Sequence, residues 1–172
     1  MAEEKVIGSW FRYFPDHYLW SQLMSGEINL SPMGGTNFYE VDQIGKRLAG
    51  KVGDSEAWHE AWLWMADKTL KLAEEEEQKG HLRTSSGAYI RSAIYRYTCE
   101  RFVHPDDPRK VQSYRNLLPH YEKGMKYLVS GFERVEVPYE DTTLSAYWLP
   151  PTSENATNPA IAFFDGLDGS KE

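Results

Sequence analysis

The hydrophobic pattern of the chain changes its period near Gly131, and this change determines the fold class that we expect. Before Gly131, apolar side chains recur every three or four positions, as they do on one face of a helix. After it, Val135 and Val137 alternate with charged residues, as in a strand with one buried face. The sequence therefore predicts an α+β chain, with a helical region over residues 1–130 and a strand region over residues 131–172.

Five helices are expected in the first region. The first begins near Pro15, which suits the first position of a helix, and ends at Gly26. Pro119 lies inside the fifth helix and is expected to kink or split it. The other helices are marked by apolar stripes from Phe38 to Leu48, Trp58 to Leu72, Tyr89 to Tyr97 and Val111 to Leu128.

Polar residues in front of these stripes predict where two of the helices begin. Asp54 or Ser55 is expected to cap the third helix, because short oxygen-bearing side chains accept hydrogen bonds from the first free backbone amides. Thr84, Ser85 and Ser86 offer caps for the fourth helix in the same way.

Three strands are expected in the second region. Two alternating segments around Glu140 read as an antiparallel hairpin. The third, residues 159–164, is a continuous apolar run, which is typical of a strand buried on both faces. A turn rich in Gly and Asp follows at its carboxyl end, where α/β sheets gather ligands and catalytic groups. A buried strand needs neighbours on both sides, and none follows, so we expect the chain to be the front part of a larger protein.

Composition excludes several classes of partner. The 172 residues include 26 acidic and 19 basic side chains, a net charge of −7 that disfavours nucleic acid and anionic membranes as partners. The single cysteine, Cys99, can form neither an internal disulfide nor a cysteine-based zinc cage. No apolar window is long enough for a membrane span, and residues 1–8 lack the apolar core of a signal peptide. We expect a cytoplasmic protein.

The turn at residues 165–169 carries the clearest chemical signal. Its glycines allow backbone N–H groups to face an oxygen that becomes negative during acyl transfer, and each such donor contributes about 3 kcal/mol to the transition state. The same pattern also fits an ordinary strand-to-loop turn. No GxSxG nucleophile motif occurs, and His59-Glu60 opens an HExxH pattern that fails at Leu63. We therefore expect no metal and no cofactor.

Aromatic residues are abundant, with six Trp and eleven Tyr. They predict either a large core between helices or an aromatic ligand cavity. The stripe that contains Trp58 and Trp62 is more typical of a core. Four side chains are candidates for a substrate-binding wall: Tyr18, Trp20, Trp62 and Tyr97.

Several segments, taken in order, give the chain a resemblance to a known family. It resembles the amino-terminal part of the α/β-hydrolases that include 2,6-dihydroxypseudooxynicotine hydrolase, the fermentation-respiration switch esterase and fungal polyketide-shortening hydrolases. The resemblance covers nearly the whole chain. It rests on Phe11–Tyr18, Gly34–Gly35 with Val41–Leu48, Ser92–Arg96, His104–Pro108 and Phe164–Glu172.

The resemblance implies a function that composition does not show. The helices would form an arm and lid over a catalytic domain whose sheet begins near Phe132. The backbone amide of Leu167 would serve the oxyanion hole, and Gly166, which has no side chain, would leave space for it. The family reaction is serine-type hydrolysis of an ester, or of a carbon–carbon bond next to a ketone, in a small-molecule substrate.

The catalytic Ser, acid and His of this fold lie downstream of the oxyanion strand and are absent from these 172 residues. We therefore expect the isolated chain to be inactive, and we expect a homodimer or association with a complementary chain. Two other interpretations stay open. One is a helical, tetratricopeptide-like interaction module built on the third and fourth helices, and the other is a non-catalytic protein that binds a small ligand between helices.

Overall fold

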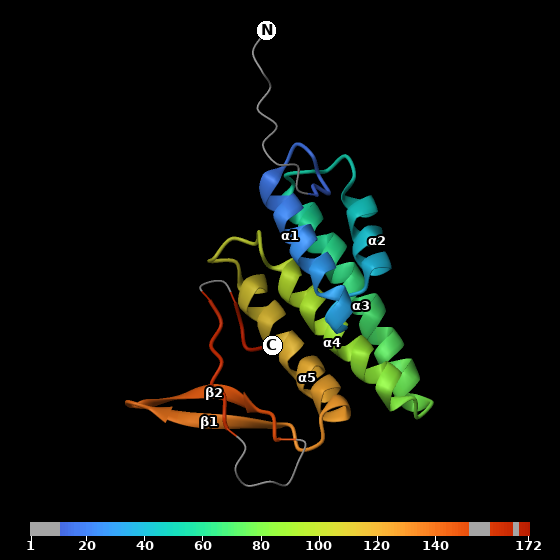
Figure 1. Cartoon of the computed structure of the whole chain (residues 1–172). Coiled ribbons are helices and arrows are strands. Elements are labelled where there is room, and N and C mark those ends of the chain that lie inside the picture. Colours follow the sequence, from blue (N-terminus) through green and yellow to red (C-terminus); the bar gives the residue numbers. More distant parts are fainter. Residues whose placement is uncertain (1–10, 152–158, 167–168) are drawn as a thin grey trace.

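The computed structural model describes residues 11–151, 159–166 and 169–172. Within these ranges the chain is α+β, with a helical body and a two-stranded hairpin at one end (Figure 1). The elements are α1 (Tyr18–Asn29), a 3-10 turn η1 (Ser31–Met33), α2 (Phe38–Leu48), α3 (Ser55–Gln78), α4 (Leu82–Cys99), α5 (Pro108–Leu128), β1 (Glu133–Tyr139) and β2 (Thr142–Trp148).

Three helices begin at short polar side chains, and one of these, Asp54, is an expected cap. The Asp54 carboxylate accepts from the backbone N–H groups of Glu56 and Ala57 at 3.0 and 3.1 Å, which starts α3. Asn37 caps α2 and Asp107 caps α5 in the same way. These caps satisfy amides that have no partner inside the helix, and each is worth about 1 kcal/mol.

The core lies between α1, α2, the first half of α3 and the second half of α4. Trp58 is its centre, with ring centroids 4.8 Å from Trp20 and 5.4 Å from Trp62. The Trp58 indole N–H donates to the carbonyl of Thr98 at 2.9 Å, so its polar atom is satisfied although the ring is fully buried. The aromatic stripe of α3 is therefore core, as the sequence favours.

Buried serines connect α4 to its two neighbouring helices. Ser85 Oγ donates to the carbonyl of Ala73 on α3 at 2.8 Å, and Ser86 Oγ donates to the carbonyl of Gly124 on α5 at 2.7 Å. The expectation that these serines cap α4 is wrong, because α4 already begins at Leu82. Their hydroxyls instead bond to carbonyls of the helices that pack against α4.

Gly26 does not end the first helix, which continues to Asn29, and Pro119 does not split the fifth, since α5 is one helix from Pro108 to Leu128. Glycine costs a helix interior only about 1 kcal/mol, which packing of the helix outweighs. Pro119 and Arg115, whose carbonyl the proline leaves without its helical donor, are both exposed, so water can satisfy that carbonyl.

The predicted hairpin is confirmed. β1 and β2 pair antiparallel, with Val137 opposite Leu144, and the chain turns at Glu140, which has φ 50°. The face towards α5 carries Tyr147, whose ring centroid lies 5.5 Å from that of Tyr121. Because strand side chains alternate, the apolar residues Val137 and Leu144 point away from α5, and they are about half exposed.

The third expected strand is not formed. Residues 159–166 have no regular secondary structure, and Ile161, Phe163 and Phe164 are 85–89% exposed. A strand exists only through hydrogen bonds to a neighbour, and the sheet in the described residues consists of β1 and β2 alone. The burial and strand pairing that the apolar pattern of 159–164 predicts are therefore not found in the described residues.

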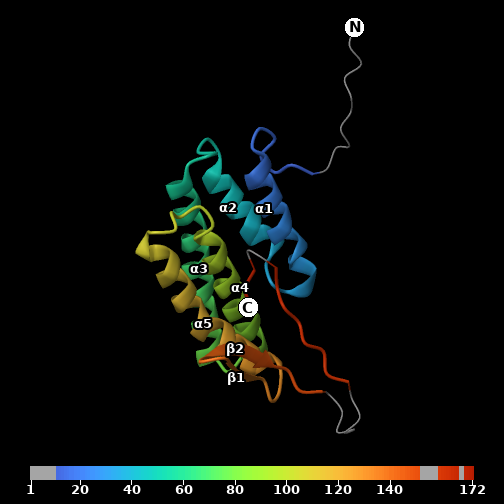
Figure 2. The ribbon, with the colours of Figure 1, turned by 90° about the vertical axis from the view of Figure 1, so that its left-hand side faces the viewer.

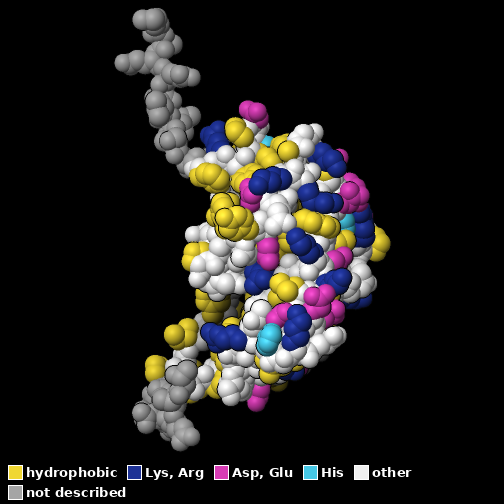
Figure 3. Space-filling model, turned by 90° about the vertical axis from the view of Figure 1, so that its right-hand side faces the viewer, with side chains coloured by type: hydrophobic (Ala, Val, Ile, Leu, Met, Phe, Trp, Pro, Cys, Tyr) yellow, Lys and Arg dark blue, Asp and Glu magenta, His cyan; other side chains and the backbone are white. Residues whose placement is uncertain are grey.

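Among the helices that the structure describes, none combines the length and the apolar character that a bilayer span requires. On the face beside α2 and α3, basic and acidic side chains are interspersed (Figure 3).

Candidate functional site

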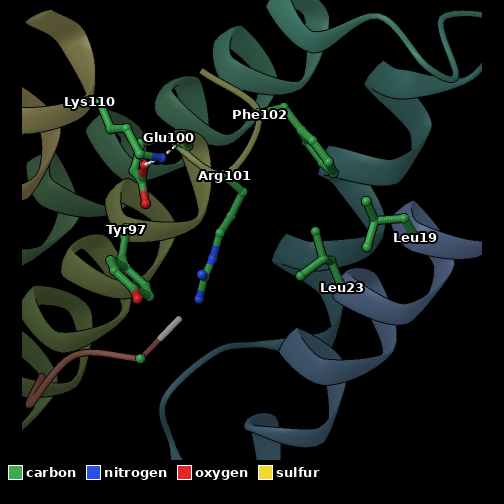
Figure 4. A pocket seen from close by; sticks show the side chains of 8 residues that line it. Leu19, Leu23, Tyr97, Glu100, Arg101, Phe102 and Lys110 are labelled. Carbon is green, nitrogen blue, oxygen red and sulfur yellow. Dashed lines mark hydrogen bonds and ion pairs between the residues drawn. The ribbon is translucent and has the colours of Figure 1, made fainter. Parts of the chain in front are cut away.

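A hollow of about 360 Å³ lies where α1 faces the end of α4 and the start of α5 (Figure 4). The C-terminal segment forms part of its wall. Its lining residues are Leu19, Leu23, Tyr97, Glu100, Arg101, Phe102, Lys110 and Gly169. The volume is at the lower end of the range for small-molecule sites, about 300–1,000 Å³.

One wall of the hollow is apolar. Leu19 and Leu23 are one helical turn apart on α1, so both side chains lie on the same face of that helix. The neighbouring face of α1 is fixed by Trp20 and Met24, which are buried in the core. Phe102 continues the apolar wall after α4, and its ring centroid lies 5.0 Å from that of Trp58. The core therefore holds this wall in place.

The opposite wall is polar. The guanidinium carbon of Arg101 lies 4.4 Å from the centre of the Tyr97 ring, and the Arg101 side chain extends into the space between Tyr97 and the two leucines (Figure 4). Burial raises the pKa of the Tyr97 hydroxyl, which keeps the phenol protonated. The Lys110 ammonium forms an ion pair with the carboxylate of Glu100. Two cations and one carboxylate thus face the hollow.

A buried carboxyl group lies between α1 and α4. Glu27 is one turn beyond Leu23 on α1, and its Oε1 accepts from the Thr98 hydroxyl at 2.6 Å. Its Oε2 is buried and has no hydrogen-bond partner within the described part of the chain. Burial raises the pKa of this carboxyl to about 7, while the Thr98 hydrogen bond and the Arg101 charge act in the opposite direction.

The predicted oxyanion turn reaches the same place. Residues 159–166 run from the hairpin end of the molecule towards α1 (Figure 2), and the C-terminal Glu172 then lies against Tyr114 of α5. Within the turn, the Gly166 N–H donates to Asp165 Oδ1 at 2.7 Å, and the Gly169 N–H donates to the Gly166 carbonyl at 3.2 Å. Gly169 lines the hollow itself.

Residues after the turn are anchored to α5 and the hairpin. The Tyr147 hydroxyl donates to Glu172 Oε1 at 3.0 Å, and the Tyr114 hydroxyl lies 3.3 Å from Glu172 Oε2. The Lys171 ammonium forms an ion pair with the same carboxylate at 2.6 Å. Although 159–164 is exposed, the chain end that follows it is thereby held against the helical body.

The residues singled out from the sequence occupy different environments. Tyr97 lines the hollow, whereas Trp20 and Trp62 are core residues with 2% and 0% exposure, and Tyr18 is 63% exposed. Gly166 is described, with its amide directed at Asp165, and Leu167 lies outside the described residues. The structure therefore brings together Tyr97 and the chain segment that carries the turn, but not the three other aromatic candidates.

Sequence reasoning missed Arg101, Phe102 and Lys110. They lie around the loop between α4 and α5, and only the fold places them opposite α1. Leu19 and Leu23 did carry a signal, since their spacing marks one face of a helix.

No group of three or more His, Cys, Asp and Glu side chains is arranged to hold a metal ion in residues 11–151, 159–166 and 169–172. The ring of His59, which begins the incomplete HExxH pattern, is buried and has its Nδ1 3.0 Å from the carbonyl of Cys99.

Comparison with known proteins places these features in a family. No family model matches the chain. Hydrolase acrC of Aspergillus aculeatus is 31% identical to it over 178 aligned positions, which cover 94% of this chain. Alpha/beta hydrolase xenA of Xenoacremonium sinensis is 27% identical over 71% of this chain. By sequence, the chain belongs to the family of these fungal α/β-hydrolases.

The match covers only part of each family member. A third α/β-hydrolase relative, 20-hydroxy-prefusarin hydrolase FUS2 of Gibberella moniliformis, is 33% identical over 80% of this chain. The aligned region is 41% of acrC, 35% of FUS2 and 30% of xenA. The chain therefore spans less than half the length of these α/β-hydrolases.

Proposed function

We propose that this chain forms the helical lid and oxyanion-hole portion of a serine-type α/β-hydrolase that cleaves an ester, or a ketone-adjacent carbon–carbon bond, in a small molecule. The relatives support the reaction class, since all three are named as hydrolases. One observation supports the location of the site. Gly169, at the end of the turn, lines a hollow together with Tyr97.

The Leu167 N–H is the proposed oxyanion donor. The Gly166 amide donates to Asp165, which fixes the start of the turn. An N–H group that is held in place before the reaction stabilises the developing negative charge at no reorganisation cost. Asp165 would then act as a positioning residue for the turn.

The nucleophile, the acid and the His are proposed to lie in a catalytic domain outside these 172 residues. Two observations support such a domain. The outer face of the hairpin exposes Val137, Leu144 and Trp148 at 46–51%, and the apolar run at 159–164 is exposed as well. Apolar surface of this extent is typical of a face that another element covers. The helical body would then form the lid above it.

The oxyanion role is tested by removing one backbone N–H from the complete protein that the native gene encodes. Leu167→Pro deletes the proposed donor, whereas Leu167→Ala changes the side chain and keeps the amide. With p-nitrophenyl acetate as substrate, we expect Leu167→Pro to lower kcat about 100- to 1,000-fold with little change in KM, and Leu167→Ala to lower it less than about 3-fold. Circular dichroism checks that both variants fold.

A serine-directed fluorophosphonate probe tests the location of the nucleophile. We expect the native gene product to be labelled and to exceed 19.9 kDa by intact mass, and the 172-residue chain to stay unlabelled. Labelling of the short chain would show that it contains a nucleophile of its own. An unlabelled native product that binds small molecules would favour the non-catalytic ligand-binding interpretation instead.

A further inference from the structure

We propose that Tyr147 on β2 and Tyr114 on α5 are positioning residues for the oxyanion turn, which they hold in place through the side chain of Glu172. The inference rests on the proposed function, because it takes the turn at residues 165–169 as the place where the reacting oxygen is stabilised. Neither tyrosine would touch the substrate, and each would act on the turn through the segment that follows it.

The Glu172 side chain is buried between α5 and the hairpin. Only 4% of its surface is exposed, and a carboxylate with so little access to water needs donors from the protein. The Tyr147 hydroxyl donates to Oε1 at 3.0 Å, closer than its other acceptor, Glu122, at 3.4 Å. The Tyr114 hydroxyl donates to Oε2 at 3.3 Å, and the Lys171 ammonium pairs with Oε1 at 2.6 Å. The two hydroxyls together hold both oxygens of this carboxylate.

Packing around the Tyr147 ring fixes the position of its hydroxyl. The ring centroid lies 5.0 Å from that of Phe132 and 5.5 Å from that of Tyr121 on α5. The Lys171 ammonium lies 5.0 Å from the centre of the same ring, within the range of a cation–π contact. Burial raises the pKa of the Tyr147 hydroxyl, and so does the neighbouring Glu172 carboxylate. The phenol therefore stays protonated and can donate to Glu172.

Only a short piece of chain connects Glu172 to the turn. Gly169 lies three positions before Glu172, and three residues span at most about 10 Å, so an anchored Glu172 limits how far Gly169 can move. Within the turn, the Gly169 N–H donates to the Gly166 carbonyl at 3.2 Å. A Cβ added to Gly169 would overlap the Asp165 carboxyl group, so Asp165 packs directly against the end of the turn. The tyrosines thus restrict the turn without contacting it.

Tyr147→Phe in the complete native gene product tests this role, because it removes the hydroxyl and keeps the ring that packs against Tyr121. With p-nitrophenyl acetate, we expect kcat to fall about 10- to 100-fold and KM to stay within about 2-fold of the parent, since a donor displaced by about 1 Å loses most of its effect. Tyr39→Phe, at a 75% exposed tyrosine of α2, is the matched control and should change neither constant.

Glu172→Ala provides a second, independent variant. It removes the acceptor that both hydroxyls share, so it should lower kcat at least as much as Tyr147→Phe does. Circular dichroism checks that each variant folds.

Hydrogen–deuterium exchange and a double-mutant cycle separate positioning from a loss of stability. In Tyr147→Phe, the amides of residues 165–172 should exchange faster than in the parent, while those of α3 should keep the parent rate. In a protein that already carries Leu167→Pro, the further change Tyr147→Phe should lower kcat less than about 2-fold, because the amide that it positions is gone. A variant that acted only through stability would lower kcat by the same factor in both backgrounds.

The inference is overturned if Tyr147→Phe keeps the parent kcat, if exchange of residues 165–172 is unchanged, or if the losses from Tyr147→Phe and Leu167→Pro are additive. A large loss of kcat in Leu167→Pro together with a normal kcat in Tyr147→Phe would uphold the oxyanion role and overturn the positioning role alone. Failure of the proposed function gives a different result, because Leu167→Pro then leaves kcat unchanged, and the positioning role falls with it.

Discussion

Glu27 makes the stability of the helical body depend on pH. Its carboxyl has a folded-state pKa of about 7, raised by burial, against 4.5 for the unfolded chain. Below the unfolded value both states are protonated and the group costs nothing. As pH rises towards 7, the unfolded carboxyl ionises first, so folding stability falls, and above 7 the loss is complete at about 3 kcal/mol. Urea unfolding at a series of pH values measures this decline.

The share of Glu27 in that pH dependence is isolated by Glu27→Gln. The amide keeps an oxygen that can accept from Thr98 and carries no charge, so the variant should be more stable than the parent above neutral pH and similar to it in acid. The exposed Glu60, changed to Gln, is the matched control and should leave the curve as it is. Parallel curves for parent and Glu27→Gln would contradict the assigned burial of this carboxyl.

At the scale of elements, the crossing of α4 and α5 depends on Gly124. A Cβ added there would lie 2.8 Å from Ile90 Cγ1 and 3.0 Å from the Ser86 carbonyl oxygen, so a side chain at this position would force atoms of α4 to shift. We expect Gly124→Ala to destabilise the chain by about 1–3 kcal/mol through overpacking. Gly26 lies within α1 with no neighbouring heavy atom inside 4 Å, so Gly26→Ala should stabilise by about 0.5–1 kcal/mol.

Thermal and urea unfolding of both glycine variants give the comparison directly. Because the same substitution is made within a helix both times, helix propensity favours alanine in each variant. Changes of opposite sign in the free energy of unfolding would therefore reflect the different space around each glycine. Equal stabilisation by both substitutions would show that α4 and α5 pack less closely than the described distances require.

Elements set by local sequence were predictable, and elements set by distant partners were not. The segment Phe38–Leu48 and the cap at Asp54 follow from the spacing of a few neighbouring residues, and both are found as expected. Ser85 and Ser86 have the chemistry of caps, but the chain folds them inward to reach carbonyls on other helices. The strand expected at 159–164 depends on pairing, and the described residues supply no pair for it.

For the whole molecule, the candidate site was predictable only in its residue types. The abundance of aromatic residues indicates aromatic contacts, but it does not show which residue makes which contact. Trp20 is a core residue, whereas Tyr97, also aromatic, lines the hollow. Which of them faces a ligand depends on how α1 packs against the end of α4. That packing also brings Leu23 opposite Arg101, and no local pattern connects two residues so far apart in the sequence.

The outer surface of the hairpin leads to a prediction about assembly. It exposes Val137, Leu144 and Trp148 next to a chain segment with three exposed large apolar residues, Ile161, Phe163 and Phe164. Apolar faces and open strand edges of this kind associate with one another in water. We therefore expect the isolated 172-residue chain to form dimers or larger species whose share grows with concentration in sedimentation velocity.

Adjacent positions on β2 provide a matched test of that surface. Side chains alternate along a strand, so Leu144 lies on the apolar outer face, whereas Thr143 points to the opposite side and is also exposed. Lysine at Leu144 places a charge within the apolar face and should shift the chain towards monomer, while Thr143→Lys adds the same charge and should leave association unchanged. A parent chain that is monomeric at every concentration would contradict the prediction, and so would an equal effect of the two lysines. Selective loss with Leu144→Lys would locate the contact on the face that we propose the catalytic domain covers.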